Sequence, residues 1–99
     1  MKIPRKLNIS GQTVKIVQKT YLNKNMKNHI GRAVFTCNKI LLSKKCEGDH
    51  IDEQYMACTL LHEVIHHLDD KLGIGLKEAQ VDRLAVGIYQ VLKDNKLQF

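Results

Sequence analysis

The stretch that decides the fold is Leu60-Leu61-His62-Glu63-Val64-Ile65-His66-His67-Leu68-Asp69, in a chain of 99 residues. Around it, apolar residues recur at spacings of three and four from about residue 52, which predicts an amphipathic helix that ends at Gly73. A second helix is predicted from Gly75 to about Asp94. The apolar side of this second helix comprises Val81, Leu84, Ala85, Ile88, Val91 and Leu92.

The half of the chain before these helices alternates apolar and polar residues with the period of a strand. Three or four strands suffice for a small, twisted, mostly antiparallel sheet. Strands followed by helices indicate the α+β class, here a three- to four-stranded twisted sheet followed by two packed helices. We expect one domain, 1–99, with a basic stranded half, 1–46, and a helical half, 47–99. The predicted strands are 5–10, 12–19, 32–37 and 39–43, with an exposed loop at 22–31.

Charge is unevenly distributed along the chain. Residues 1–46 contain 11 Lys or Arg and no acidic residue, whereas residues 47–99 contain 5 basic and 10 acidic residues, so the halves carry +11 and −5 and sum to +6. This asymmetry indicates a positive surface on one part of the fold, which could attract nucleic acid or an acidic protein. A simpler interpretation is that the halves attract each other and the remaining charge aids solubility.

Three cysteines, Cys37, Cys46 and Cys58, are an odd number without a Cys-x-x-Cys pair. They favour free, buried thiols in a reducing cytoplasm over a disulfide framework or a cysteine-ligated zinc. No apolar run approaches the ~18 residues that a membrane helix needs. No apolar stretch follows the basic start Met-Lys-Ile-Pro-Arg-Lys, as one would in a secretory signal. We therefore expect a cytoplasmic protein with no membrane partner.

The chemistry of the motif depends on its position within a helix. His62 and His66 are four residues apart, so a helix stacks their imidazoles on one face, where both can bind one tetrahedral metal ion. Glu63 lies about 100° round the helix from His62 and can reach the surroundings of the metal without binding it, as a base for water must. A glutamate in so apolar a segment is costly unless a cation or donor is near.

A catalytic zinc site needs a third protein ligand and an open position. Glu78, in the first turn of the second helix, is the favoured ligand. Gly73 and Gly75 allow the chain to reverse, so this helix can pack back across the first. Asp82, four residues after Glu78 on the same face, could accept a hydrogen bond from a ligand histidine and fix its tautomer.

Other interpretations of these residues stay open. Asp70 is a less favoured third ligand, because three ligands on one short helix crowd the geometry. His67 directly follows His66 and points elsewhere, so it is interpreted as a surface residue or a support for a ligand. Glu78 could also be a solvated carboxylate that the helix dipole favours, and the histidines could lie on the surface of an ordinary helix.

These residues resemble those of the gluzincins, metallopeptidases with two histidine ligands and a downstream glutamate. The chain is more closely similar to the very short minigluzincins and small phage-type metallopeptidases. The similarity rests on Leu-Leu-His-Glu-Val-Ile-His-His-Leu-Asp and Glu-Ala-Gln-Val-Asp-Arg-Leu-Ala, within about 58–94. It implies a small zincin-like domain with a zinc ion (Zn2+) held by His62, His66 and Glu78. It also implies Glu63 as general base, with Asp82 at the aspartate of the family's Glu-x-x-x-Asp pattern.

The chain departs from the larger family members in two places. The interval between His66 and Glu78 is much shorter than in large gluzincins, so their additional substrate-binding elements are absent. Lys77 stands where a capping Ser or Asp is expected.

Together these features predict a zinc-dependent peptidase that hydrolyses peptide bonds through a metal-bound water activated by Glu63. Its substrate would be a peptide or protein, and an edge strand such as 32–37 could align an extended peptide. One alternative is a basic module that binds nucleic acid or protein and carries a structural or latent zinc site. Another is a self-inhibited peptidase whose tail, 95–99, or a loop fills the cleft.

Overall fold

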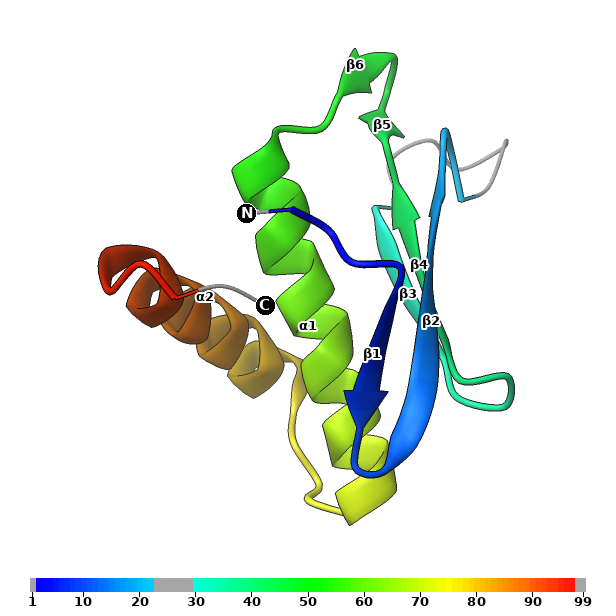
Figure 1. The fold of residues 1–99 in the computed structure, drawn as a ribbon, viewed down its shortest axis with the longest axis vertical. Helices are drawn as coiled ribbons and strands as arrows, with labels where there is room; N and C mark the ends of the chain where they lie inside the picture. Colours follow the sequence, from blue (N-terminus) through cyan, green and yellow to red (C-terminus); the bar gives the residue numbers. More distant parts are fainter. Residues whose placement is uncertain (1, 23–29, 98–99) are drawn as a thin grey trace.

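The strands and helices follow the predicted order, strands first and helices second. The structure is a computed structural model that describes residues 2–22 and 30–97. Figure 1 shows a sheet, then a long helix packed on it, then a second helix beyond the first. The α+β class and the two packed helices are confirmed. The elements are β1 (Lys6–Ile9), β2 (Gln12–Lys19), β3 (Gly31–Val34), β4 (Lys39–Ser43), β5 (Lys45–Cys46), β6 (Asp49–His50), α1 (Glu53–Leu72) and α2 (Glu78–Asp94).

The four-stranded sheet has the order β1-β2-β4-β3 and is mixed. The β1–β2 and β3–β4 pairs are antiparallel, as predicted, whereas β2 and β4 run parallel. The third strand ends at Val34 rather than at residue 37, because the chain turns there and Asn38 has a φ of 48°. The small β5–β6 hairpin was not predicted. Most of the predicted loop 22–31 lies outside the described residues.

α1 is buried on two sides, which explains its nearly continuous apolar sequence. At about 100° per residue, consecutive leucines point in different directions. Leu60 packs toward the sheet in a cluster with residues of β1, β2 and β4, whereas Leu61 and Ile65 pack against α2. The remaining side of α1 faces neither layer fully, and this side carries His62 and His66. The sheet-side cluster comprises Ile9, Val14, Ile16, Ile40, Leu42 and Leu60.

The connection between the helices is fixed by hydrogen bonds. α1 ends at Gly73, whose φ of 63° is the left-handed conformation that glycine adopts readily. The carboxylate of Asp69 accepts hydrogen bonds from the backbone N–H groups of Gly75 and Leu76, at 2.7 and 3.0 Å. Gly75 also has a positive φ, 84°, so α2 begins at Glu78 and not at Gly75 as predicted. The loop therefore determines where the first turn of α2 lies.

α2 packs only part of its predicted apolar side against α1. Val81 and Ala85 are buried against α1, and Tyr89 and Leu92 pack beside them. The predicted apolar positions Leu84, Ile88 and Val91 are exposed instead. The reason is that α2 packs on a single helix, which can cover only a narrow stripe of it.

All three cysteines are free thiols, but the predicted burial was wrong. Cys37 is exposed, and Cys46 and Cys58 are half-buried. None of the helices in the described part of the chain is both long enough and apolar enough to cross a membrane.

Candidate metal centre

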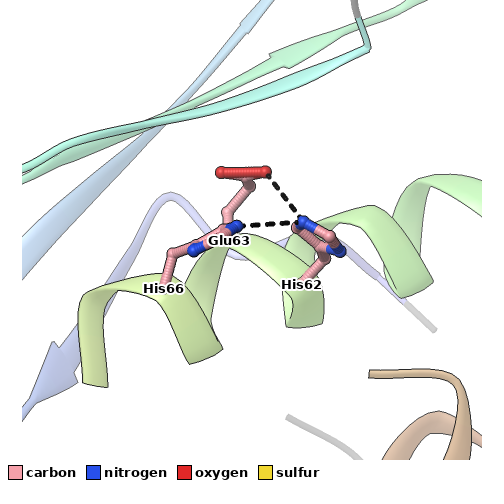
Figure 2. A group of neighbouring side chains, drawn as sticks. All are labelled: His62, Glu63 and His66. Atoms are coloured by element: carbon pink, nitrogen blue, oxygen red, sulfur yellow. Dashed lines mark hydrogen bonds and ion pairs between the residues drawn. The ribbon is translucent and has the colours of Figure 1, made fainter. Parts of the chain in front are cut away.

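α1 brings the three side chains of the motif together. Figure 2 shows His62, Glu63 and His66 rising from the same helix, with the ring nitrogens turned toward one another. The Nε2 atoms of His62 and His66 lie 3.1 Å apart, and Oε1 of Glu63 lies 4.0 Å from Nε2 of His62. The potential ligand atoms of this group all lie within 4.8 Å of one another. A group of this composition could hold a metal ion.

α2 adds two carboxylates to the same place. Oε1 of Glu78 lies 2.8 Å from Nε2 of His62, and Oε2 of Glu78 lies 3.1 Å from Nε2 of His66. Oδ1 of Asp82 lies 2.8 Å from Nδ1 of His62, on the other side of the ring. The buried contact of Val81 with α1 explains this placement, because it holds the first turn of α2 against the histidines.

Three of the donor-atom separations are close to those between the ligands of a tetrahedral zinc ion. A tetrahedral zinc ion with bonds of 2.0–2.1 Å has ligand atoms about 3.3 Å apart. The two Nε2 atoms and the Glu78 carboxylate are separated by 3.1, 2.8 and 3.1 Å. The donor atoms are thus spaced for one small ion.

The hydrogen bond of His62 determines whether its Nε2 atom carries a proton or a lone pair. If Nδ1 of His62 donates to Asp82, its Nε2 atom carries a lone pair. That lone pair then faces a carboxylate oxygen of Glu78 at 2.8 Å and Nε2 of His66 at 3.1 Å. Acceptors this close repel each other unless a proton or a cation lies between them. The chemistry of the donors therefore fits a bound cation.

Glu63 differs from the other carboxylates in its burial. Its side chain is 9 % exposed, whereas those of Glu78 and Asp82 are 65 % and 64 % exposed. Burial raises the pKa of Glu63, and Glu78 adds to this, while the two histidines lower the pKa and oppose the shift. Glu63 is thus a desolvated carboxyl beside the candidate ligands.

A cleft of about 480 Å³ opens over this group. Its floor is α1, and its walls are the first half of α2 and the start of β3. Within the described residues, none of 95–97 reaches it. The lining residues are Ile30, Gly31, Tyr55, Cys58, Thr59, His62, Glu63, His66, Glu78, Asp82, Ala85 and Val86.

Of these lining residues, Gly31, Thr59 and Cys58 were not predicted from the sequence. A Cβ atom on Gly31 would lie 2.6 Å from Cγ2 of Thr59 and 3.4 Å from the Glu63 carboxylate. Gly31 thus allows β3 to approach α1 beside Glu63. Burial and the charge of Asp82 raise the pKa of the Cys58 thiol. A glycine at the end of the predicted loop 22–31 was the one available signal.

His67 and Asp70 lie outside the candidate metal groups of the described residues. His67 was predicted at the surface or in support of a ligand, and this is wrong. It is 0 % exposed, its Nε2 lies 2.9 Å from the carbonyl of Lys39, and its ring meets Phe35 edge-on. His67 therefore belongs to the contact between α1 and the sheet. Asp70, the less favoured ligand, is exposed and is in neither candidate metal group of the described residues.

No family model, curated protein or solved structure matches the chain. The roles of the five predicted site residues therefore rest on the arrangement of the side chains alone.

Proposed function

We propose that this chain is a zinc-dependent peptidase in which His62, His66 and Glu78 hold the metal and Glu63 is the general base. The observation that carries the proposal is the convergence of three acceptor groups at mutual distances of 2.8–3.1 Å, next to a buried carboxyl. Two imidazoles and one carboxylate are a donor set that zinc prefers when a further position stays open for chemistry.

Asp82 supports the ligand arrangement rather than binding the metal. Its carboxylate lies 2.8 Å from Nδ1 of His62, the nitrogen that points away from the candidate metal position. Accepting the Nδ1 proton fixes the tautomer that presents the Nε2 lone pair and holds the ring in place. Removing this acceptor is expected to weaken metal binding by about 10–100-fold without abolishing it.

Proton transfer is the role of Glu63 in this proposal. A bound zinc ion would supply Lewis acidity and make water at the site easier to deprotonate. Glu63 takes a proton from water and passes it to the leaving amine. Its burial suits this role, because desolvation brings the pKa of the carboxyl closer to neutrality, where a base works best.

The cleft favours an extended peptide as substrate. β3 pairs with β4 on one side, and in the described part of the chain no strand pairs with its other side. Ile30 and Gly31, at the start of β3, line the cleft beside Glu63. A peptide strand added to this edge would pass over the histidines and could be held by backbone hydrogen bonds.

A protein digest tests the proposal. Wild type loaded with zinc is expected to cleave casein, and Glu63→Gln is expected to bind zinc equally well but to lose cleavage by a factor of about 100 or more. The matched control is Glu53→Gln, the same substitution at the exposed start of α1 and outside the cleft, which should leave zinc binding and cleavage unchanged. Zinc-loaded wild type that cleaves neither casein nor a mixed peptide library would refute the peptidase, as would full activity in Glu63→Gln.

A further inference from the structure

The face of the sheet that points away from α1 concentrates positive charge. Side chains along a strand alternate between the two faces, and the residues of β1, β2 and β4 that face α1 form the buried apolar cluster. Their neighbours in sequence point the other way. Figure 1 shows no helix on that side of the sheet. The exposed basic residues there, which we call the basic sheet face, are Lys6, Lys15, Lys19, Arg32 and Lys39.

Three of these lysines stand side by side. Lys6 on β1 is directly opposite Lys15 on β2, and Lys15 is paired in register with Lys39 on β4. Neighbouring strands are about 4.8 Å apart, so the three form a row across the sheet about 10 Å long. Like charges directly opposite each other in a sheet are destabilising. The fold thus carries a repulsive row that its own packing does not require.

Within residues 2–22 and 30–97, the strands of this face carry no acidic side chain. Residues 1–46 contain no acidic residue at all, and every carboxylate side chain lies at Glu47 or later, in the β5–β6 hairpin or the helical half. Of the described residues, none forms an ion pair with a lysine or arginine of the basic sheet face. Four ion pairs between described residues lie on the opposite side of the sheet, at the histidines of α1.

We infer that the basic sheet face binds the phosphate backbone of a nucleic-acid duplex, independently of the peptidase cleft. A duplex carries one negative charge per about 1.7 Å of its axis, which can neutralise a row of lysines spaced about 5 Å apart. The five basic side chains surround Val17 and Leu41, which are half-buried and carry no base-reading polar group. A face made mainly of lysine side chains suits contacts with phosphates, which carry no sequence information themselves.

The composition of the basic sheet face fits two other polyanions, single-stranded nucleic acid and an anionic membrane, less well. Single-stranded nucleic acid is usually held by aromatic side chains on which the bases stack, and the strand residues of this face include no aromatic residue. An anionic membrane surface is usually bound by basic residues together with inserted apolar ones. The exposed large apolar residues of the described chain lie outside the strands, in helices and connecting segments. Phosphate contacts to a stiff duplex remain the best match.

Fluorescence anisotropy with a short labelled DNA duplex of mixed sequence tests the inference. The full chain is compared with K6Q/K15Q/K39Q and with R83Q/K93Q/K96Q, which removes the same charge from α2 and the segment after it. The first variant should bind roughly tenfold more weakly or worse, and its plot of log affinity against log salt should be flatter by up to about 3 units. The control should lose about threefold at most, and Glu63→Gln should bind like wild type.

Four results would overturn the inference. Equal losses in the two triple variants would mean that only the net charge matters. If the wild type does not bind the duplex, the basic sheet face is not a site for duplex nucleic acid. If it binds phosphatidylserine vesicles or polyglutamate more tightly than the duplex, its ligand is an anionic membrane or an acidic protein. A lower melting temperature of K6Q/K15Q/K39Q at low salt would contradict the premise that the lysine row is repulsive, because relief of repulsion should leave stability equal or higher.

Discussion

The adjacent histidines His66 and His67 on α1 lie in different environments, one in the cleft and the other in the core. His66 points into the cleft, with 25 % of its side chain exposed and its Nε2 atom beside His62 and Glu78. His67, one residue later, is 0 % exposed and contacts the carbonyl of Lys39 in the sheet. The step of about 100° per residue separates them. The sequence alone shows that they diverge, but not that the second one is part of the core.

This difference predicts opposite effects of two neighbouring substitutions. His66→Ala should abolish stoichiometric zinc binding while leaving the metal-free protein nearly as stable as wild type. His67→Leu keeps the buried volume but removes the hydrogen bond to the Lys39 carbonyl, which should cost about 0.5–1.5 kcal/mol of unfolding free energy. Its zinc binding should stay intact. Urea unfolding in chelator and zinc titration measure the two quantities, and a loss of zinc in both variants would contradict the assignment.

Glu63 carries a cost that its position in the cleft explains. It is 7 % exposed, and burial raises its pKa above the ordinary value of 4.5. A carboxyl whose pKa is higher in the folded state than in the unfolded state favours folding only while it is protonated. That contribution is complete below pH 4.5 and is lost as the pH rises through the raised pKa.

A glutamine at this position should therefore stabilise the metal-free protein in a pH-dependent way. With chelator present, Glu63→Gln should melt higher than wild type at neutral pH, because the variant buries no charge. The difference should shrink on acidification toward pH 4.5, where wild-type Glu63 is increasingly protonated. Thermal melts over this range measure the difference. A gain that is independent of pH, or a loss at neutral pH, would be inconsistent with a desolvated carboxyl.

At the scale of the elements, the site depends on how closely β3 approaches α1. Gly31 lies against Thr59 and Glu63, and Thr59 is held by a hydrogen bond of 2.9 Å from its Oγ1 to the carbonyl of Tyr55. A branched side chain fixed in this way cannot rotate aside without losing that bond. The glycine therefore matters for its missing side chain, which lets the strand edge and the general base lie together.

Substitution of Gly31 tests this contact, and a second substitution at Thr59 should reverse its effect. Gly31→Ala should lower the unfolding free energy by about 1–3 kcal/mol, since its Cβ overlaps Cγ2 of Thr59. Thr59→Ser removes that methyl group but keeps the hydroxyl, so the double variant should recover most of the loss. Chemical denaturation of the four proteins forms a double-mutant cycle. Additive losses without recovery would show that the overlap is not the cause.

The elements show where prediction from the sequence succeeded. Strands 12–19 and 39–43, and the end of α1 at Gly73, were predicted because alternation and a left-handed glycine are local signals. The parallel pairing of β2 with β4 was missed, since register between distant strands depends on the core that α1 covers. α2 was started too early, because the hydrogen bonds from Gly75 and Leu76 to Asp69 are not visible in a local pattern.

The same contrast holds for the site. The group of His62, Glu63 and His66 follows from the helix period alone. The approach of Glu78 and Asp82 was predicted from the two glycines between the helices, and their short distances to His62 agree with it. The sequence favoured strand 32–37 as the edge that aligns a peptide, but the contact of Gly31 with Thr59 and Glu63 was not predicted, because it depends on how the sheet packs on α1.

The whole molecule separates its charges by layer. The helical side carries the candidate metal centre and most carboxylates, whereas the outer face of the sheet carries the lysine row. α1 lies between them, buried on both sides by separate apolar clusters. The charge asymmetry predicted from the sequence thus corresponds to two faces of one fold. Substitutions at the candidate metal centre therefore leave the lysine row unchanged, and substitutions in the lysine row leave the metal centre unchanged.

The most direct test of the central claim is the zinc content of the purified chain, measured by elemental analysis beside that of Glu78→Ala. The site is built from groups on both helices, so metal binding reports on the fold and the chemistry together. We expect stoichiometric zinc in wild type and a loss of most of it in Glu78→Ala, with Glu47→Ala, an exposed acid in the β5–β6 turn, as the control that keeps the metal. Wild type that contains no zinc and gains none on titration would contradict the account.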